Sequence, residues 1–240
     1  MSLIRRIFGT LSGAFTLASV MTAGLVLLIW HPETPLAPEW NPIEPLDVRA
    51  PVTPVTHWKL DRSTTGLACH GALASSGASF NILDDFEETQ VCHIRDRLNV
   101  STLSDVAIDP LDTRCITALL TALWVEHGLK PAAAKHLDSP IARLNQIGSY
   151  NCRPIRTMAG TGTRMSTHST ASAIDITGVT LKNGQRIRLI DDWGDGDEGA
   201  FLKEARDTAC DWFGTTLGPD FNALHADHFH LQVRGRGLCR

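Results

Sequence analysis

Residues 173–190 read AIDITGVTLKNGQRIRLI, and this stretch decides the fold class. Two apolar runs rich in β-branched residues meet at Asn183-Gly184, the dipeptide that a type I′ hairpin turn prefers. We therefore predict two strands joined by this turn. Asp175 lies in the first strand, where a buried carboxylate is costly unless a metal, a salt bridge or a helix cap stabilises it.

The segments around this hairpin mix helical and strand patterns. Residues 141–151 alternate loosely and predict a strand, and residues 228–233 (HFHLQV) predict a closing strand. Residues 113–128 and 199–214 carry apolar side chains at helical spacing, and Gly128 is placed to end the first helix. The sequence thus predicts an α+β fold, a mixed and mainly antiparallel sheet with flanking helices.

The N-terminal segment, residues 1–30, has the pattern of a membrane helix. After Arg5 and Arg6, the run Ile7–Trp30 holds 24 residues without a charge. At 1.5 Å per residue it spans about 36 Å, enough for a hydrocarbon core of about 30 Å. We expect an uncleaved single-pass anchor with the arginine pair in the cytoplasm, because no small-x-small site follows the run and Trp30 suits the membrane interface. A cleaved signal peptide is the alternative.

Residues 31–56 are rich in proline. Seven of the twelve prolines fall between Pro32 and Pro54. This composition favours an extended, semi-rigid spacer, with a disordered linker as the alternative. The predicted folded domain is residues 57–240.

All six cysteines lie in this domain, and an even count in an exported chain favours three disulfides. A zinc-finger arrangement is the alternative, and it lacks any C-x-x-C pair. Of fifteen connectivities, pairing neighbours along the chain gives Cys69–Cys92, Cys115–Cys152 and Cys210–Cys239. The net charge of −4, with no basic run, argues against a nucleic-acid partner.

Residues 225–230 read HADHFH and hold three of the ten histidines. On a strand His228 and His230 share one face, while Phe229 and Leu231 point to the core. Two imidazoles on one face can bind one metal, or one can bind while the other carries protons. Histidines exposed on an edge strand are the other interpretation.

Residues 166–175, STHSTASAID, place His168 seven residues before Asp175. One histidine, one aspartate and one further histidine make a three-ligand set with an open fourth position, as catalytic zinc requires. The two stretches together therefore predict a zinc site more specifically than either does alone.

Four stretches resemble the bacterial extensin-like C-terminal domain family from about Cys69 to Arg240: SYNCRP, MSTHSTASAIDITGVTLKNGQRI, FLKEARDTACDWFGTTLGPDFNALHADHFHLQV and the final CR. That family is similar to the LAS group of zinc peptidases, which includes D-Ala-D-Ala carboxypeptidases and a murein endopeptidase. Hedgehog domains share the LAS fold. The group's signature, S-x-H-x6-D followed by H-x-H, is matched in order by Ser166, His168, Asp175, His228 and His230.

The resemblance implies that His168, Asp175 and His230 bind zinc and that His228 is an unligated catalytic histidine. The carboxypeptidases carry a glutamate a few residues before the last ligand, and this chain has none there. HADHFH instead resembles the H-x-x-H-x-H of the murein endopeptidase, which places His225 at the rim of the site.

Two further residues follow from the same resemblance. Arg153, fifteen residues before His168, matches an arginine of the group and is expected to stabilise the developing oxyanion. Ser166 is expected to orient the loop beside the substrate. Ala171 departs from the group, which usually has glycine three residues after the first ligand.

The implied function is a zinc peptidase that cleaves the peptide cross-links of peptidoglycan, as an endopeptidase rather than a carboxypeptidase. Its expected place is the inner membrane, crossed once, with the catalytic domain in the periplasm. The alternative is a non-catalytic envelope module that keeps the metal site and binds peptidoglycan or a partner, since a fold alone does not define function.

Overall fold

The computed structural model describes residues 2–31 and 33–240, with side chains from residue 13 onward. The chain divides into two compact units. One holds the residues up to Leu46 together with Pro51–Asp61, and the other holds Asp47–Ala50 together with Arg62–Arg240.

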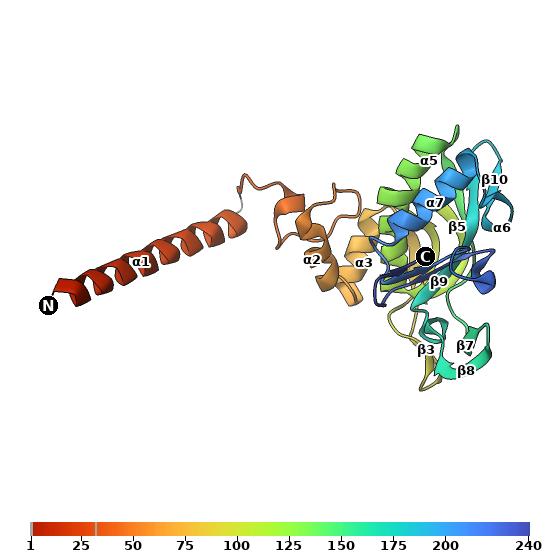
Figure 1. The fold of residues 1–240 in the computed structure, drawn as a ribbon, viewed down its shortest axis with the longest axis horizontal. Coiled ribbons are helices and arrows are strands. Elements are labelled where there is room, and N and C mark those ends of the chain that lie inside the picture. The colour runs from red at the N-terminus through yellow and green to blue at the C-terminus, as the bar shows by residue number, and fades with distance from the viewer. Residues whose placement is uncertain (1, 32) are drawn as a thin grey trace. The chain divides into compact units, whose positions relative to one another are not determined.

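The first unit begins with helix α1 (Ser2–Trp30) (Figure 1). Its stretch Gly13–Trp30 is long and apolar enough to cross a membrane, although a signal sequence passes the same test. The side chains of Arg5 and Arg6, on which the predicted orientation rests, lie outside the described residues, as does Pro32.

The proline-rich segment is only partly extended. A 3-10 helix forms at Pro38–Trp40, and helix α2 spans Pro54–Arg62. Lys59 Nζ lies 2.6 Å from the carbonyl oxygen of Pro38 and donates a hydrogen bond to it. The predicted boundary at residue 57 therefore falls inside a helix, and the spacer contains folded turns.

The second unit is built on one large sheet in the order β1-β4-β5-β6-β9-β12-β11-β13, with β10 paired to β9. Only the β5–β6 and β11–β13 pairs are parallel among the described strands, which confirms the predicted mixed, mainly antiparallel sheet. The strands are β1 (Ser79–Ile82), β4 (Arg97–Leu103), β5 (Val106–Arg114), β6 (Ile141–Gly148), β9 (Ala173–Leu181), β10 (Arg186–Arg188), β11 (Thr215–Leu217), β12 (Phe229–Gln232) and β13 (Leu238–Cys239). Two small hairpins stand apart, β2 (Phe86–Thr89) with β3 (Cys92–Ile94) and β7 (Pro154–Thr157) with β8 (Gly160–Met165).

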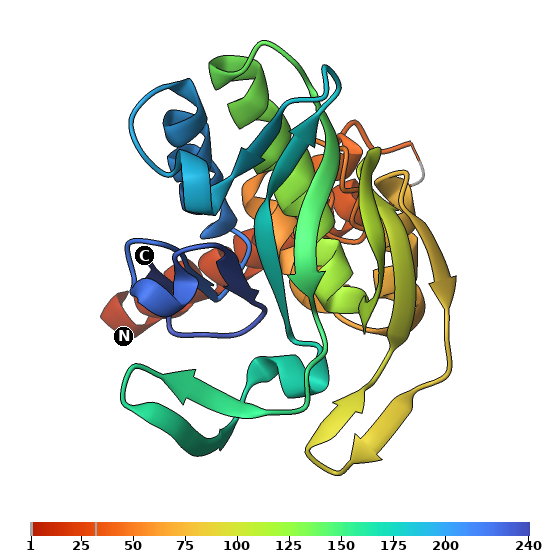
Figure 2. The same cartoon turned by 90° about the vertical axis from the view of Figure 1, so that its right-hand side faces the viewer.

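Helices cover one face of this sheet, and Figure 2 shows the green pair α4 (Cys115–Trp124) and α5 (Lys130–His136) behind the central strands. The other helices of this unit are α3 (Gly66–Ser75), α6 (Leu189–Asp192) and α7 (Asp197–Ala209). All ten residues of α4 are buried, as expected of a helix that is apolar on every side. The Trp124 indole donates to the Ala205 carbonyl in α7 at 2.9 Å, which fastens the two helices together.

Gly128 does not end the first predicted helix. The chain continues through a π turn (Val125–Leu129) into α5. A Cβ atom at Gly128 would lie 2.6 Å from Thr208 Oγ1 and 2.8 Å from Trp124 Cδ1. The glycine therefore permits close packing against α7 instead of acting as a helix terminator.

The predicted hairpin is present, but its turn type differs from the prediction. Gly184 N–H donates to the Leu181 carbonyl at 3.0 Å, and Leu181 N–H donates to the Gln185 carbonyl at 2.8 Å. Gly184 has a φ of 90°, whereas Asn183 is not among the residues with positive φ. This is a type I turn followed by a glycine bulge, in which the Asn183 side chain accepts from Gln185 N–H at 3.0 Å.

Three disulfides are present, and only Cys210–Cys239 matches the predicted pairing. The other two are Cys69–Cys115 and Cys92–Cys152. Pairing neighbours along the chain failed because α3 packs on α4, which brings Cys69 to the start of α4. Cys92 in β3 instead joins the segment that leads into β7.

Candidate metal centre

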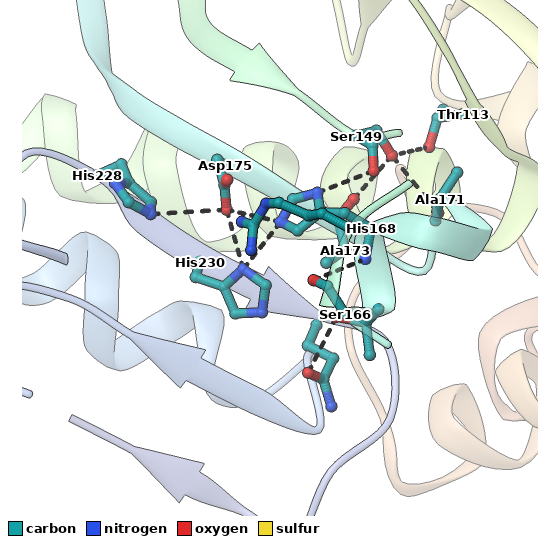
Figure 3. Close-up of polar contacts among 12 residues, drawn as sticks. Thr113, Ser149, Ser166, His168, Ala171, Ala173, Asp175, His228 and His230 are labelled. Atoms are coloured by element: carbon teal, nitrogen blue, oxygen red, sulfur yellow. Dashed lines mark hydrogen bonds and ion pairs between the residues drawn. The ribbon is translucent and has the colours of Figure 1, made fainter. Parts of the chain in front are cut away.

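Three predicted ligands converge at one point between η3 (the 3-10 turn Thr167–Thr170), β9 and β12 (Figure 3). The sheet register sets Asp175 of β9 directly opposite His230 of β12. Asp175 Oδ1 lies 2.9 Å from His230 Nδ1 and 3.1 Å from His168 Nε2, and these two nitrogens are 3.1 Å apart. The structure thus brings together three donor atoms from three elements.

The turn that carries His168 is fixed by its two ends. Ser166 Oγ accepts a hydrogen bond from His168 N–H at 3.3 Å and caps the turn. Ala171 closes it in the left-handed conformation (φ 48°) with its side chain fully buried. A left-handed backbone favours glycine, and any other residue at this position costs about 1 kcal/mol.

A backbone carbonyl group fixes the tautomer of His168. Its Nδ1 lies 2.9 Å from the Ser149 carbonyl oxygen, which can only accept, so Nδ1 carries a hydrogen. Nε2 then faces Asp175 and His230. The Ser149 hydroxyl is itself held by Thr113 Oγ1 and the Ala173 carbonyl, each at 2.7 Å. Metal-binding histidines are typically oriented by such a carbonyl contact.

Asp175 is charged at neutral pH despite its burial. Burial raises the pKa of this carboxyl, but hydrogen bonding to His168 and His230 and the charge of these imidazoles outweigh it. The pKa of Asp175 therefore lies well below its usual value. A buried anion between two imidazole nitrogens is an environment suited to a cation.

The donor set fits zinc in kind and in spacing. Zinc takes histidine nitrogens and carboxylate oxygens at about 2.0–2.1 Å, so tetrahedral neighbours lie about 3.3 Å apart. The separations of 2.9–3.1 Å found here are only slightly shorter. One other described group, Cys69, Asp96 and Cys115, also has converging donor atoms, but its two sulfurs are bonded to each other.

His228 lies next to the three ligands without joining them. Its Nε2 is 3.8 Å from Asp175 Oδ1, and its Nδ1 is 2.8 Å from Asp227 Oδ1. The predicted shared face of His228 and His230 is thus present, although β12 begins only at Phe229. Strand alternation predicts that Asp227 faces away from the metal in a supporting or structural role, and in the structure its carboxylate contacts the His228 ring.

His225 lies beside the histidines of the cluster. Its ring centroid is 5.3 Å from that of His228 and 6.0 Å from that of His230. The Nδ1 atom of His225 lies 2.8 Å from Asn222 Oδ1, which accepts a hydrogen bond from it. Burial, together with the charges of His228 and His230, lowers the pKa of His225 to about 4. The ring is therefore neutral at pH 7.

Arg153 and Ser166 are adjacent through their backbones, since Ser166 N–H donates to the Arg153 carbonyl at 3.0 Å. The Arg153 guanidinium, however, donates to the Pro154 carbonyl at 3.3 Å, and none of its described contacts reaches the three ligands. The Ser166 hydroxyl is occupied by the cap. Their predicted roles toward substrate stay predictions.

The fold and the site define an α+β domain, stapled by disulfides, with a candidate metal centre of two histidines and one aspartate. The chain belongs to the family described as extensin-like protein C-terminus, whose model matches residues 67–240. That span contains every candidate site residue and all six cysteines. No curated protein and no solved structure matches the chain.

Proposed function

We propose that the chain is a zinc-dependent peptidase that cleaves peptide bonds in peptidoglycan cross-links. The observation that carries the proposal is the convergence of His168, Asp175 and His230, with His228 beside them. Three ligands are the number that catalytic zinc sites use, and structural sites usually have four. The similarity of the family to the LAS peptidases supplies the substrate class.

The three ligands would hold zinc, which keeps one position for water, lowers the pKa of that water to about 7 and polarises a carbonyl. His228 takes a proton from the attacking water and passes it to the leaving amine. Asp227 accepts from Nδ1 of His228 and so leaves Nε2 facing the site. Arg153 would have to turn from the Pro154 carbonyl to reach the oxyanion.

The residues before the last ligand favour an endopeptidase over a carboxypeptidase. The position where the carboxypeptidase branch carries a glutamate base has none here, and His225 stands at the rim instead. A neutral His225 adds no charge to the site and can line the path of an extended peptide.

The proposed location is the inner membrane, with α1 as a single-pass anchor and the domain in the periplasm. Three disulfides with no free cysteine support an oxidising compartment. The apolar stretch Gly13–Trp30 supports attachment to a membrane.

One observation favours a second candidate, a non-catalytic module that binds peptidoglycan or a partner protein. The Arg153 side chain contacts the carbonyl of Pro154 instead of facing the three ligands. A site that only binds has no need of an oxyanion partner.

The test is digestion of purified peptidoglycan by the zinc-loaded full chain in detergent, with the released muropeptides identified by mass spectrometry. Asp175→Ala is the inactive comparison, and Asp195→Ala, an exposed carboxylate outside the site, is the matched control. Cleavage by the native chain and Asp195→Ala only would establish the peptidase. No cleavage by a chain that binds one zinc would favour the binding module.

A further inference from the structure

Arg114, at the end of β5, is a half-buried arginine without a carboxylate partner. Its Nη1 donates to Ser172 Oγ at 2.9 Å. Its Nε is buried and has no hydrogen-bond partner among the described residues. A buried N–H group without an acceptor costs free energy, so this guanidinium is incompletely satisfied.

A second arginine lies beside it. Val233 N–H donates to the Ser172 carbonyl at 3.0 Å, which brings the chain at Arg234 next to the serine that Arg114 contacts. Burial lowers the pKa of Arg114, and the charge of Arg234 lowers it further. Within residues 33–240, neither guanidinium forms an ion pair.

The carboxylates of Asp96 and Asp85 partly offset the lowering of the Arg114 pKa. Both carboxylates, however, have other partners. Asp96 accepts from Gly66 N–H and contacts His70 Nε2, each at 2.9 Å. Asp85 accepts from Asp96 N–H at 2.9 Å. These two groups therefore do not neutralise the arginine pair.

Six arginines elsewhere in this unit have acidic partners. Ion pairs are formed by Arg49, Arg95, Arg97, Arg143, Arg188 and Arg206. The chain also carries more acidic than basic residues, 26 against 22. Arg114 and Arg234 differ from these six arginines, because the described residues give neither of them an acidic partner.

The segments that carry the metal ligands also lead to this arginine pair. Ser172 lies between His168 and Asp175 in the chain, and its hydroxyl is 2.9 Å from Thr170 Oγ1. On β12, Gln232 follows His230 on the same face. The Gln232 amide donates to the Arg234 carbonyl, so one strand links the ligand to the second arginine.

We propose that Arg114, Arg234 and the Ser172 hydroxyl form a subsite that binds a free carboxylate of a peptide. A guanidinium presents paired N–H donors that match a carboxylate, and the Ser172 hydroxyl holds the Arg114 guanidinium by accepting from its Nη1. A carboxylate bound by the two guanidinium groups would relieve the repulsion between the two arginines. The choice of a peptidoglycan peptide as ligand rests on the proposed function.

The test measures binding and does not need turnover. Isothermal titration of the full chain in detergent, with and without zinc, uses acetyl-L-Lys-D-Ala-D-Ala and the same peptide with a C-terminal amide. We expect the acid to bind roughly tenfold or more tightly than the amide, as a charge-assisted contact would give. Arg234→Met and Arg114→Lys should lose most of this difference, and Arg186→Met, an exposed control in β10, should keep it.

The Arg234 variant and its melting temperature keep the test valid if the Arg114 variant does not fold. Arg234 is exposed, so Arg234→Met should fold, and without ligand its melting temperature should equal or exceed that of the native chain because one repulsive charge is gone. Equal affinity of the native chain for acid and amide would overturn the subsite. So would equal losses in Arg234→Met and Arg186→Met.

Inorganic phosphate separates a peptide carboxylate site from a general anion site. Phosphate that binds as tightly as the acid peptide, with the same dependence on Arg234, would overturn the assignment to a peptide carboxylate. An arginine-dependent preference for the acid in a chain that cleaves no peptidoglycan would uphold the subsite and refute the peptidase. Cleavage of peptidoglycan by a chain that binds acid and amide equally would uphold the peptidase and refute the subsite.

Discussion

Two groups of side chains in this protein bring three potential metal ligands together, and they differ in what already satisfies them. Cys69 and Cys115 are bonded to each other, and the Asp96 carboxylate beside them accepts from Gly66 N–H and contacts His70. We call this group the closed cluster. His168, Asp175 and His230 form the open cluster.

The donor atoms of the open cluster are held in place by contacts outside the cluster. The Ser149 carbonyl orients His168, and the sheet register orients Asp175 and His230. Proximity alone therefore does not define a metal site. What distinguishes the two clusters is that two donor atoms of the closed cluster are covalently bonded to each other.

The largest expected effect is the loss of metal from Asp175→Ala. Removing the only anionic ligand should abolish zinc binding and turnover together. Asp96→Asn in the closed cluster should keep about one zinc per chain. Zinc content by atomic absorption after gel filtration measures both variants, and equal loss in the two would show that the clusters do not differ as described.

The next effect separates a ligand from a neighbour of ligands. His228→Ala should keep the zinc and lower turnover by about 10²–10⁴-fold, the usual contribution of a positioned acid or base. The matched change in the closed cluster is His70→Ala, which should leave turnover near native. Zinc loss in His228→Ala would mean that His228, and not His230, completes the ligand set.

Much of the fold could be predicted because its signals are local. The β9–β10 hairpin, the strand at β6 and the helix at α7 follow from apolar periodicity and a turn dipeptide. The helix from α4 to α5 ran past Gly128 because tertiary packing against Thr208, and not capping, places glycine there. The predicted turn type at Asn183-Gly184 was wrong because the same dipeptide also suits a type I turn followed by a glycine bulge.

The candidate site was predictable in its ligands but not in its supporting contacts. His168, Asp175 and His230 follow from a spaced motif, which is local information. The carbonyl of Ser149 behind His168 and the pair of Arg114 with Ser172 join residues far apart in the chain. The disulfide pairing failed likewise, because it depends on which helices pack together.

The third effect concerns stability alone. Replacing both Cys69 and Cys115 by serine removes a crosslink across 46 residues, which should lower the free energy of unfolding by about 4 kcal/mol in the chain-entropy account. Urea denaturation monitored by tryptophan fluorescence measures this change. Zinc content should stay near one per chain below the transition, and a loss of zinc there would tie the closed cluster to the metal.

The smallest effect lies at the rim of the open cluster. Burial first, and the charges of His228 and His230 second, lower the pKa of His225 to about 4, whereas its unfolded value is about 6.5. Between these values the unfolded chain binds more protons, so His225 makes the folded state less stable as the pH falls from about 6.5 to 4. His225→Gln should remove this contribution, about 1 kcal/mol after allowing for solvent screening of a partly exposed ring.

Urea denaturation of the metal-free chain at pH 7, 6, 5 and 4 should therefore show a smaller loss of stability in the variant. Parallel curves for variant and native chain would mean that the acid sensitivity of the open cluster between pH 7 and 4 does not arise at its rim. Asp175 would not account for it, because the stabilising contribution of its lowered pKa is lost only below about pH 4.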